Sequence, residues 1–402
     1  MTMNDIKTWL RSKSSDDWYF YIKRLSANDT GASGAHQVGV YIPKGYMTFL
    51  FPSINRIDTK NPSLYLTAKT SSHDFLEKQV RAIYYNNKFF DGTRNEMRIT
   101  SWGGSKSPLQ DHENTGAIVV LAFCKNEDCD SKLIDVWVCR SLEEENFIET
   151  LTGELLPGLS IFTDANKVIS GSTVSYDWKS KDYPIPEEWN IKFPSGTEII
   201  NYLTQVFDIK ADTSDKKLLL RREAEYSLFK KIEEVHVLEL IKSGFTSVDD
   251  FIALANSISN RRKSRSGKSL ELHLEHIFLE NGLTEFETQA KTENNKKPDF
   301  LFPSANAYHD LSYPSDKLRM LAVKTTCKDR WRQVLNEADR INDVYLFTLQ
   351  EGVSKNQFKE MKDSNVKLVV PRPIHSSFHK DIRNEILSLE EFIDKTKSLV
   401  LN

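Results

Sequence analysis

Seven short runs of aromatic and β-branched residues follow one another between residues 18 and 141. Clusters of Gly, Asn, Asp and Pro separate them, and none of the intervals holds a long helical pattern. Short strands at this spacing favour a barrel or a sandwich over alternating α/β units. The runs are WYFYIKRL, VGVYIP, SLYLTAKT, VRAIYYN, EMRITSW, AIVVLAFCK and DVWVCRS. We therefore predict an N-terminal all-β domain.

A polar stretch, SGSTVSYDWKSKDYPIPEEW at residues 170–189, ends this pattern. Pro184 and Pro186 disfavour a helix there, and the composition is typical of a linker. The prediction is an N-terminal domain over residues 1–170, a linker over 171–189 and a second domain over 190–402.

The pattern beyond the linker is helical first and mixed afterwards. Residues 215–242 and 270–278 repeat apolar positions at helical spacing. Strand-like runs then alternate with helices, which predicts a mixed α/β sheet covered by helices. The expected strands are 299–303, 318–326, 343–349 and 366–371, and the expected helices are about 329–340 and 354–364.

Composition sets limits on the kind of protein this is. The formal net charge is −3, so a nucleic-acid partner has to be argued from local patches such as RRKSRSGK at 261–268, with five basic residues in eight. No stretch approaches the length of a membrane span, and the N-terminus lacks an apolar signal region. Four cysteines in 402 residues favour free thiols in a reducing cytoplasm.

One constellation suggests metal-dependent phosphodiester hydrolysis. That reaction needs carboxylate ligands for a hard cation and a lysine that orients or deprotonates water. Asp299 opens one strand-like run and Lys324 closes another, so neighbouring strands would bring them together. Glu337 follows thirteen positions after Lys324. From spacing alone the simpler interpretation stays open: a strand start at Asp299, a snorkelling Lys324 and a surface Glu337.

This arrangement resembles the PD-(D/E)XK nuclease superfamily, with one departure. The second acid usually lies two residues before the lysine, and that position here is Ala322, which cannot bind a metal. The resemblance implies that Glu337 replaces it, as in a branch of restriction endonucleases. Glu271, upstream on a helix, resembles an additional acid of these enzymes. Lys328 competes with Lys324 for the role of catalytic lysine.

A wider resemblance extends from about residue 18 to 372. The segments at 19–43, 93–103, 107–117, 251–276 and 296–340 resemble the EcoRII-like type IIE restriction endonucleases, which cut CCWGG. The resemblance implies a homodimer that cleaves before the first cytosine with Mg²⁺ bound by Asp299 and Glu337. It also implies a B3-like pseudobarrel that binds a second CCWGG copy and covers the catalytic cleft until then.

Base recognition in the catalytic domain is expected from two groups. Lys328, Asp329 and Arg330 suit C·G pairs, because Lys and Arg donate to guanine and Asp accepts from cytosine. Arg222 and Tyr226 lie one helical turn apart and would sandwich a flipped central base. The alternative interpretations are a solvated helix start for the first group and core packing for Tyr226.

In the N-terminal domain Arg94, Glu96 and Arg98 alternate along one strand-like segment, and His36 with Gln37 forms a second candidate arm. Paired charges on a solvated ribbon explain the first group equally well. Two rival functions also remain: a sequence-specific DNA-binding regulator with an inactive nuclease fold, and a structure-specific repair nuclease.

Overall fold

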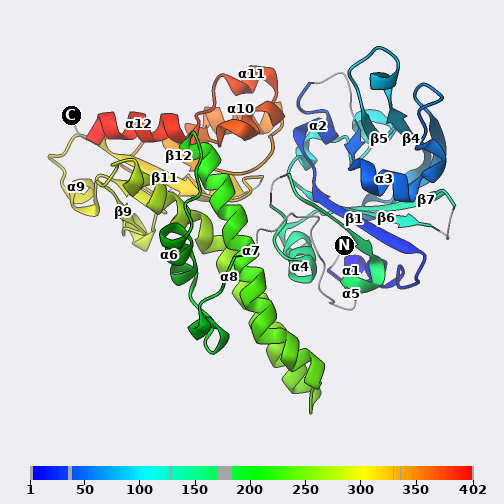
Figure 1. Cartoon of the computed structure of the whole chain (residues 1–402). Helices are drawn as coiled ribbons and strands as arrows, with labels where there is room; N and C mark the ends of the chain where they lie inside the picture. The colour runs from blue at the N-terminus through cyan, green and yellow to red at the C-terminus, as the bar shows by residue number, and fades with distance from the viewer. Residues whose placement is uncertain are drawn as a thin grey trace. The chain divides into compact units, whose positions relative to one another are not determined.

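The computed structural model describes residues 3–34, 39–125, 129–156, 158–169, 183–328, 330–335 and 337–400. The chain divides into two compact units (Figure 1). The first is Met1–Trp178 together with two later segments, Gln350–Phe358 and Ser376–Asn384. Within it, the N–H of Ala27 donates to the carbonyl oxygen of Glu351 at 2.9 Å. The two units are therefore not contiguous in sequence.

An eight-stranded sheet forms the first unit, in the order β2-β5-β4-β3-β7-β6-β1-β8. Neighbouring strands are antiparallel except β3 and β7, which are parallel. Each of the seven predicted runs contains a strand, so the expected β domain is confirmed; β8 was not predicted. The strands are β1 Trp18–Arg24, β2 Val40–Tyr41, β3 Ser63–Thr70, β4 Phe75–Tyr85, β5 Glu96–Thr100, β6 Ile118–Cys124, β7 Leu133–Val138 and β8 Ser160–Asp164.

Both faces of this sheet are buried, which explains the unbroken apolar sequence of β6. Leu121 of β6 points into one core, in which Tyr21 of β1 and Val40 of β2 also lie. Strands near the two ends of the sheet order share this core, so the sheet curls around it. Val120 points into the opposite core, which helices cover. The helices of this region are α1 Met3–Arg11, α2 Ala27–Thr30, α3 Lys44–Leu50, α4 Leu142–Thr152 and α5 Ala165–Ile169.

The second unit is built on a five-stranded sheet in the order β13-β12-β11-β10-β9. The three strands β11, β12 and β13 are parallel, and β10 and β9 are antiparallel to their neighbours, so the predicted mixed sheet is confirmed. The strands are β9 Glu287–Thr288, β10 Phe300–Phe302, β11 Arg319–Val323, β12 Val344–Phe347 and β13 Val366–Val369. The helices after the linker are α6 Gly196–Val206, α7 Ser214–Ser243, α8 Val248–Glu280, α9 Ala305–His309, α10 Lys355–Asp363, α11 Lys380–Arg383 and α12 Leu389–Val400.

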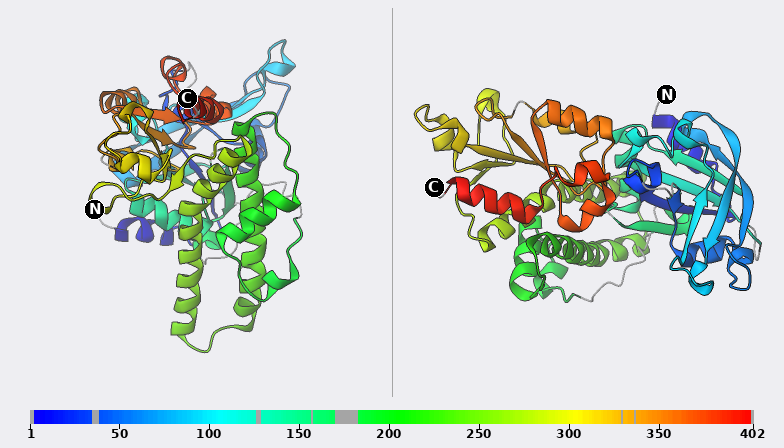
Figure 2. Two further views of the ribbon diagram at one scale, coloured as in Figure 1. Left: turned by 90° about the vertical axis from the view of Figure 1, so that its left-hand side faces the viewer. Right: turned by 90° about the horizontal axis from the view of Figure 1, so that it is seen from above.

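Two long helices, α7 and α8, form a hairpin whose outer end projects from the sheet (Figures 1 and 2). Helix α8 continues without a break through the basic stretch 261–268. Ion pairs to α7 explain the continuity, because Arg262 contacts Glu233 at 2.6 Å and Arg265 contacts Glu225 at 2.5 Å. Acids on α7 thus neutralise part of the basic stretch.

The prediction of a helix over about 329–340 was wrong. The structure has a 3-10 helix only over Arg330–Val334, followed by turns. Contacts from a preceding loop offer the backbone other partners. The hydroxyl of Thr292 donates to the carbonyl oxygen of Glu337 at 2.5 Å, and the N–H of Asp339 donates to Glu293 at 3.3 Å. Such side-chain bonds compete with helical hydrogen bonding.

Candidate active site

Asp299 and Lys324 meet at one edge of the second sheet. Strands β10 and β11 are antiparallel, with Phe300 opposite Leu321, so the start of β10 lies beside the end of β11. Oδ2 of Asp299 accepts a hydrogen bond from the N–H of Val323 at 2.7 Å and lies 3.4 Å from Nζ of Lys324. Asp299 is buried, whereas Lys324 is half-buried. The two residues predicted to converge do so.

Glu337 contributes a second carboxylate, and its oxygen Oε2 is buried without a hydrogen bond from any residue that the structure describes. Burial raises the pKa of Glu337 to about 7; the charge of Lys324 opposes this shift and that of Asp299 adds to it. These electrostatic effects place Glu337 in the same local field as the Asp299–Lys324 pair. An orphaned carboxylate oxygen of this kind suits a cation.

Glu271, on the sheet-proximal part of α8, joins the site through a residue that sequence reasoning missed. The amide nitrogen Nε2 of Gln289 donates to Oδ1 of Asp299 at 3.0 Å and to Oε2 of Glu271 at 3.4 Å. Lys268 also donates to Glu271, at 2.9 Å. Burial raises the pKa of Glu271, Lys268 opposes this shift, and the charge of Asp299 adds to it. The position of Gln289 beside Asp299 follows from the register of β9 against β10. No sequence motif marks this residue.

The donor set fits a hard divalent cation. Across the ranges that the structure describes, no three His, Cys, Asp or Glu side chains converge closely enough to hold a metal by themselves. Mg²⁺ does not require such a group, because it keeps several waters and binds through one or two carboxylates plus substrate phosphates. Asp299 and the orphaned oxygen of Glu337 supply these carboxylates.

The structure describes two of the three predicted base-reading residues near the site. Lys328 lies in a half-buried turn, and Arg330 begins the 3-10 helix and is also half-buried. Asp329 lies outside the described residues. Lys324 lies four positions before Lys328, its rival for the role of catalytic lysine. The Nζ atom of Lys324 lies 3.4 Å from the carboxylate of Asp299.

Arg222 and Tyr226 are core residues of the α7–α8 hairpin. Their exposed fractions are 1% and 4%, and Nη1 of Arg222 donates to the hydroxyl of Ser269 at 2.5 Å. The guanidinium of Arg265 lies 4.6 Å from the ring centroid of Tyr226. Both side chains are thus packed within the hairpin, and their stacking on a flipped base stays a prediction.

In the first unit Arg94, Glu96 and Arg98 form one ion-paired row. Arg94 contacts Glu96 at 2.5 Å and lies over the ring of Tyr85 at 3.7 Å. Arg98 contacts the same glutamate at 3.3 Å and is itself buried. The side chains therefore share a face, as predicted, and their charges are paired. His36 and Gln37 lie outside the described residues.

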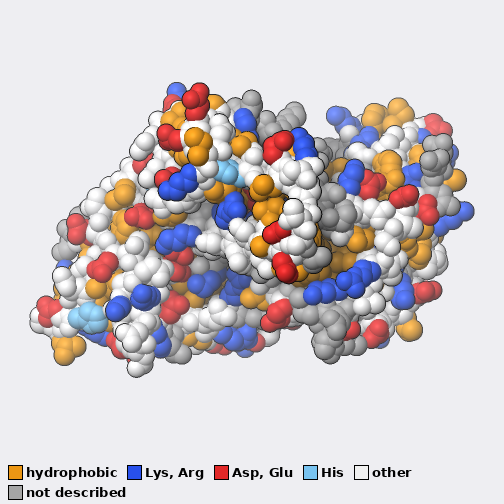
Figure 3. Space-filling model, turned by 90° about the horizontal axis from the view of Figure 1, so that it is seen from below, with side chains coloured by type: hydrophobic (Ala, Val, Ile, Leu, Met, Phe, Trp, Pro, Cys, Tyr) orange, Lys and Arg blue, Asp and Glu red, His pale blue; other side chains and the backbone are white. Residues whose placement is uncertain are grey.

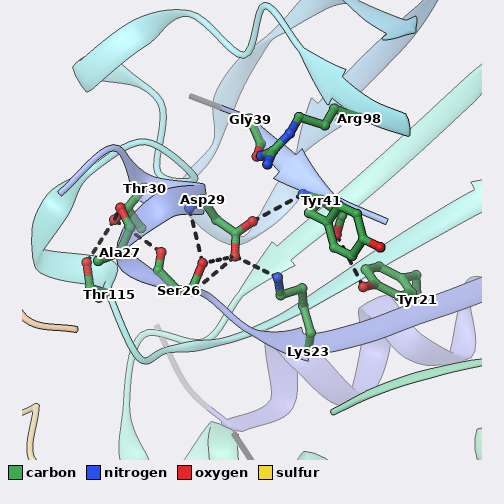
Figure 4. Close-up of polar contacts among 10 residues, drawn as sticks. All are labelled: Tyr21, Lys23, Ser26, Ala27, Asp29, Thr30, Gly39, Tyr41, Arg98 and Thr115. Carbon is green, nitrogen blue, oxygen red and sulfur yellow. Dashed lines mark hydrogen bonds and ion pairs between the residues drawn. The ribbon is translucent and has the colours of Figure 1, made fainter. Parts of the chain in front are cut away.

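A polar cluster beside Arg98 was also missed by sequence reasoning (Figure 4). Asp29, which is 1% exposed, accepts from Nζ of Lys23 at 2.6 Å, from the N–H and hydroxyl of Ser26 at 2.9 and 2.8 Å, and from the N–H of Tyr41 at 3.1 Å. Nη1 of Arg98 donates to the carbonyl oxygen of Gly39 at 3.0 Å. The cluster fixes the chain on both sides of residues 35–38.

Comparison with known proteins defines the class as that of type II restriction enzymes, which are site-specific deoxyribonucleases. The chain is 52% identical over 400 residues, 99% of each chain, to the type II restriction enzyme EcoRII of Escherichia coli. Models of the EcoRII N-terminal and C-terminal regions match residues 14–167 and 229–393. The chain therefore belongs to the EcoRII family of restriction endonucleases.

Two more distant relatives match parts of the chain. The type II restriction enzyme SsoII of Shigella sonnei is 28% identical over 159 residues, 37% of this chain and 50% of SsoII. The solved structure of metal-depleted Ecl18kI in complex with uncleaved, modified DNA is 20% identical, with a TM-score of 0.44 over 54% of this chain and 82% of that one. None of the described helices combines the length and apolar composition that crossing a membrane requires.

Proposed function

We propose that this restriction endonuclease is of type IIE and hydrolyses double-stranded DNA at CCWGG, before the first cytosine, with Mg²⁺. The observation that carries the proposal is the carboxylate of Asp299, held by the N–H of Val323 and by Lys324 at a sheet edge. The near full-length likeness to EcoRII supports the recognition sequence. The proposed fold is PD-(D/E)XK-like over residues 190–402 and B3-like over 1–170, with 171–189 as linker; the curled sheet supports the second assignment.

Each residue of the site has a proposed role in the reaction. Asp299 and Glu337 would hold Mg²⁺, which supplies charge neutralisation at the phosphoryl oxygens and lowers the pKa of water. Lys324 orients the attacking water and balances the charge that develops on the phosphate. Glu271 adds a further acidic side chain at the site. Lys328, Asp329 and Arg330 read the C·G pairs.

The first unit is proposed to bind a second copy of CCWGG and to control the active site. The ion-paired row of Arg94, Glu96 and Arg98, together with His36 and Gln37, is the proposed contact surface. Asp29 supports it by fixing the chain on both sides of residues 35–38. A closed site that opens on binding requires the effector DNA to favour the open state.

A homodimer is part of the proposal, and the outer end of the α7–α8 hairpin supports it. Large apolar side chains there are 37–54% exposed. They are Val235, Leu238, Leu240, Ile241, Phe245, Phe251 and Ile252. Exposed apolar side chains that cluster in this way are typical of a surface that a partner subunit covers. Figure 3, viewed from the side to which the hairpin points, shows hydrophobic side chains gathered on that face.

A plasmid digest tests the proposal. Plasmids with several CCWGG sites, one site or none are incubated with the protein and Mg²⁺, and the product ends are sequenced. We expect ends before the first cytosine of CCWGG, slow cutting of the one-site plasmid, and acceleration when a CCWGG duplex is added. Cutting of the plasmid without a site would favour a repair nuclease. Equal rates on one-site DNA with and without added duplex would exclude the effector role.

A protein of this kind would act in the cytoplasm, where bacterial DNA is found.

A further inference from the structure

Gln289 occupies an unusual backbone position directly beside the candidate active site. Its φ is +53°, in the left-handed region that residues other than glycine rarely adopt. Its N–H donates to the carbonyl oxygen of Asp299 at 3.3 Å, so the turn after β9 is fixed against the start of β10. Strained backbone of this kind persists where the surroundings enforce it, often at functional sites.

The side chain of Gln289 links two acids that come from different elements. Nε2 carries two N–H donors, one for each contact: Oδ1 of Asp299 at 3.0 Å and Oε2 of Glu271 at 3.4 Å. Asp299 precedes a strand and Glu271 lies on helix α8. A neutral amide between two carboxylates offsets their mutual repulsion and sets their separation.

We propose that Gln289 is a positioning residue that holds Glu271 beside the metal-binding Asp299. This inference rests on the proposed function, because it assigns Asp299 to a divalent cation. Glu271 then acts on the cation through the geometry that Gln289 imposes. Partners that orient metal ligands are typically worth about 10- to 100-fold in metal affinity or activity.

Two variants separate positioning from a purely structural role. Gln289→Ala removes the amide and keeps the left-handed strain, whereas Gln289→Gly removes the amide and relieves the strain. Glu285→Ala, on the exposed segment just before β9, is the matched control. Thermal melts of all variants verify folding, and we expect Gln289→Gly to melt no lower than the wild type.

The test is the affinity of the full chain for Mn²⁺ without DNA, measured by electron paramagnetic resonance, together with the Mg²⁺ dependence of cleavage. We expect both Gln289 variants to bind Mn²⁺ about tenfold more weakly than the wild type and to need about tenfold more Mg²⁺, with an unchanged KM for DNA. Adding Glu271→Ala to Gln289→Gly should weaken Mn²⁺ binding no further. Asp299→Asn is the reference for loss of the site.

Unchanged or tighter Mn²⁺ binding by Gln289→Gly would overturn the inference, as would losses that add independently in the double variant. Because Mn²⁺ binding is measured without cleavage, the two hypotheses fail separately. A wild-type protein that cuts no DNA would contradict the proposed function, whereas equal Mn²⁺ affinities of the wild type and Gln289→Gly would contradict the positioning role alone.

Discussion

Two lysine–carboxylate pairs, one in each unit, differ in the lysine–carboxylate distance and in the bonding of the acid that lies beside the pair. In the first unit, Lys23 lies 2.6 Å from Asp29, whose side chain also accepts hydrogen bonds from Ser26 and Tyr41. Burial lowers the pKa of Lys23, but the charge and hydrogen bond of Asp29 together with the charges of Tyr21 and Glu351 outweigh burial, and the pKa lies above its ordinary value. Both charged groups of this pair are therefore bonded.

The pair in the second unit is looser, and the acid beside it is incompletely bonded. Lys324 lies 3.4 Å from Asp299, and the neighbouring Glu337 keeps a buried oxygen without a partner among the described residues. A fully bonded buried network stabilises one conformation, whereas unsatisfied ionisable groups that perturb one another are typical of reactive sites. From this contrast we propose that the first pair contributes to stability and the second to chemistry, and the variants below test that proposal.

The largest expected effect distinguishes the roles of the two lysines near the candidate active site. Lys324→Ala should lower the single-turnover cleavage rate by about 10²–10⁴-fold, because it removes the group that orients water and balances charge. Lys328→Ala should keep the chemical step at saturating DNA and weaken binding of the CCWGG duplex by about tenfold. Rates and duplex affinities of both variants are measured side by side. The reverse pattern would make Lys328 the catalytic lysine.

The buried pair of the first unit should affect stability and leave the chemistry intact. Asp29→Ala leaves the ammonium of Lys23 buried without its partner, so we expect a loss of about 3–5 kcal/mol in the free energy of unfolding. Asp164→Ala breaks an exposed ion pair with Lys167 in the same unit and should cost less than about 1 kcal/mol. Denaturant unfolding measures both variants. Equal costs would remove the distinction between a bonded core pair and a surface pair.

The smallest effect is a pH-dependent change in stability. Burial raises the pKa of Glu337 to about 7, above the value of about 4.3 in an unfolded chain. The folded protein therefore holds a proton that the unfolded chain has lost, and stability falls as the pH rises from about 4.3 to about 7. Partial exposure limits the effect to about 1 kcal/mol. Glu337→Gln lacks this titration.

Melting temperatures in a metal chelator test this reasoning. Relative to Glu337→Gln, the wild type should lose about 2–4 °C between pH 5 and pH 8. A constant difference between the two proteins across this range would show that Glu337 does not titrate with a raised pKa.

Much of the fold could be predicted from local patterns. Ser195 forms a capping box with Glu198 at the start of α6, and a serine followed three residues later by a glutamate marks a helix start in the sequence itself. The stripe containing Leu274 and Phe278 is buried as predicted. The helix expected at 329–340 failed because bonds from Thr292 and Glu293, more than thirty positions earlier, hold that backbone in turns. The continuity of α8 likewise depends on ion pairs to α7 that no local pattern shows.

The candidate site was likewise predictable only in part from the sequence. Asp299 and Lys324 follow from strand ends, so their proximity could be predicted from sequence. Gln289 and Asp29 could not, because their roles depend on strand register and on loop closure rather than on a motif. Arg222 and Tyr226 have the spacing for base stacking, but the same spacing places them in the core between two helices.

Single-turnover cleavage by Asp299→Asn tests most directly the claim that the looser pair, with Glu337 beside it, is the catalytic centre. Asparagine keeps the size and an oxygen acceptor of the side chain but removes the charge that a cation requires. With Mg²⁺ and a saturating CCWGG duplex, we expect cleavage to fall by about 10³-fold or more, with duplex binding in Ca²⁺ and the melting temperature nearly unchanged. Cleavage by Asp299→Asn at a near-normal rate would contradict the account.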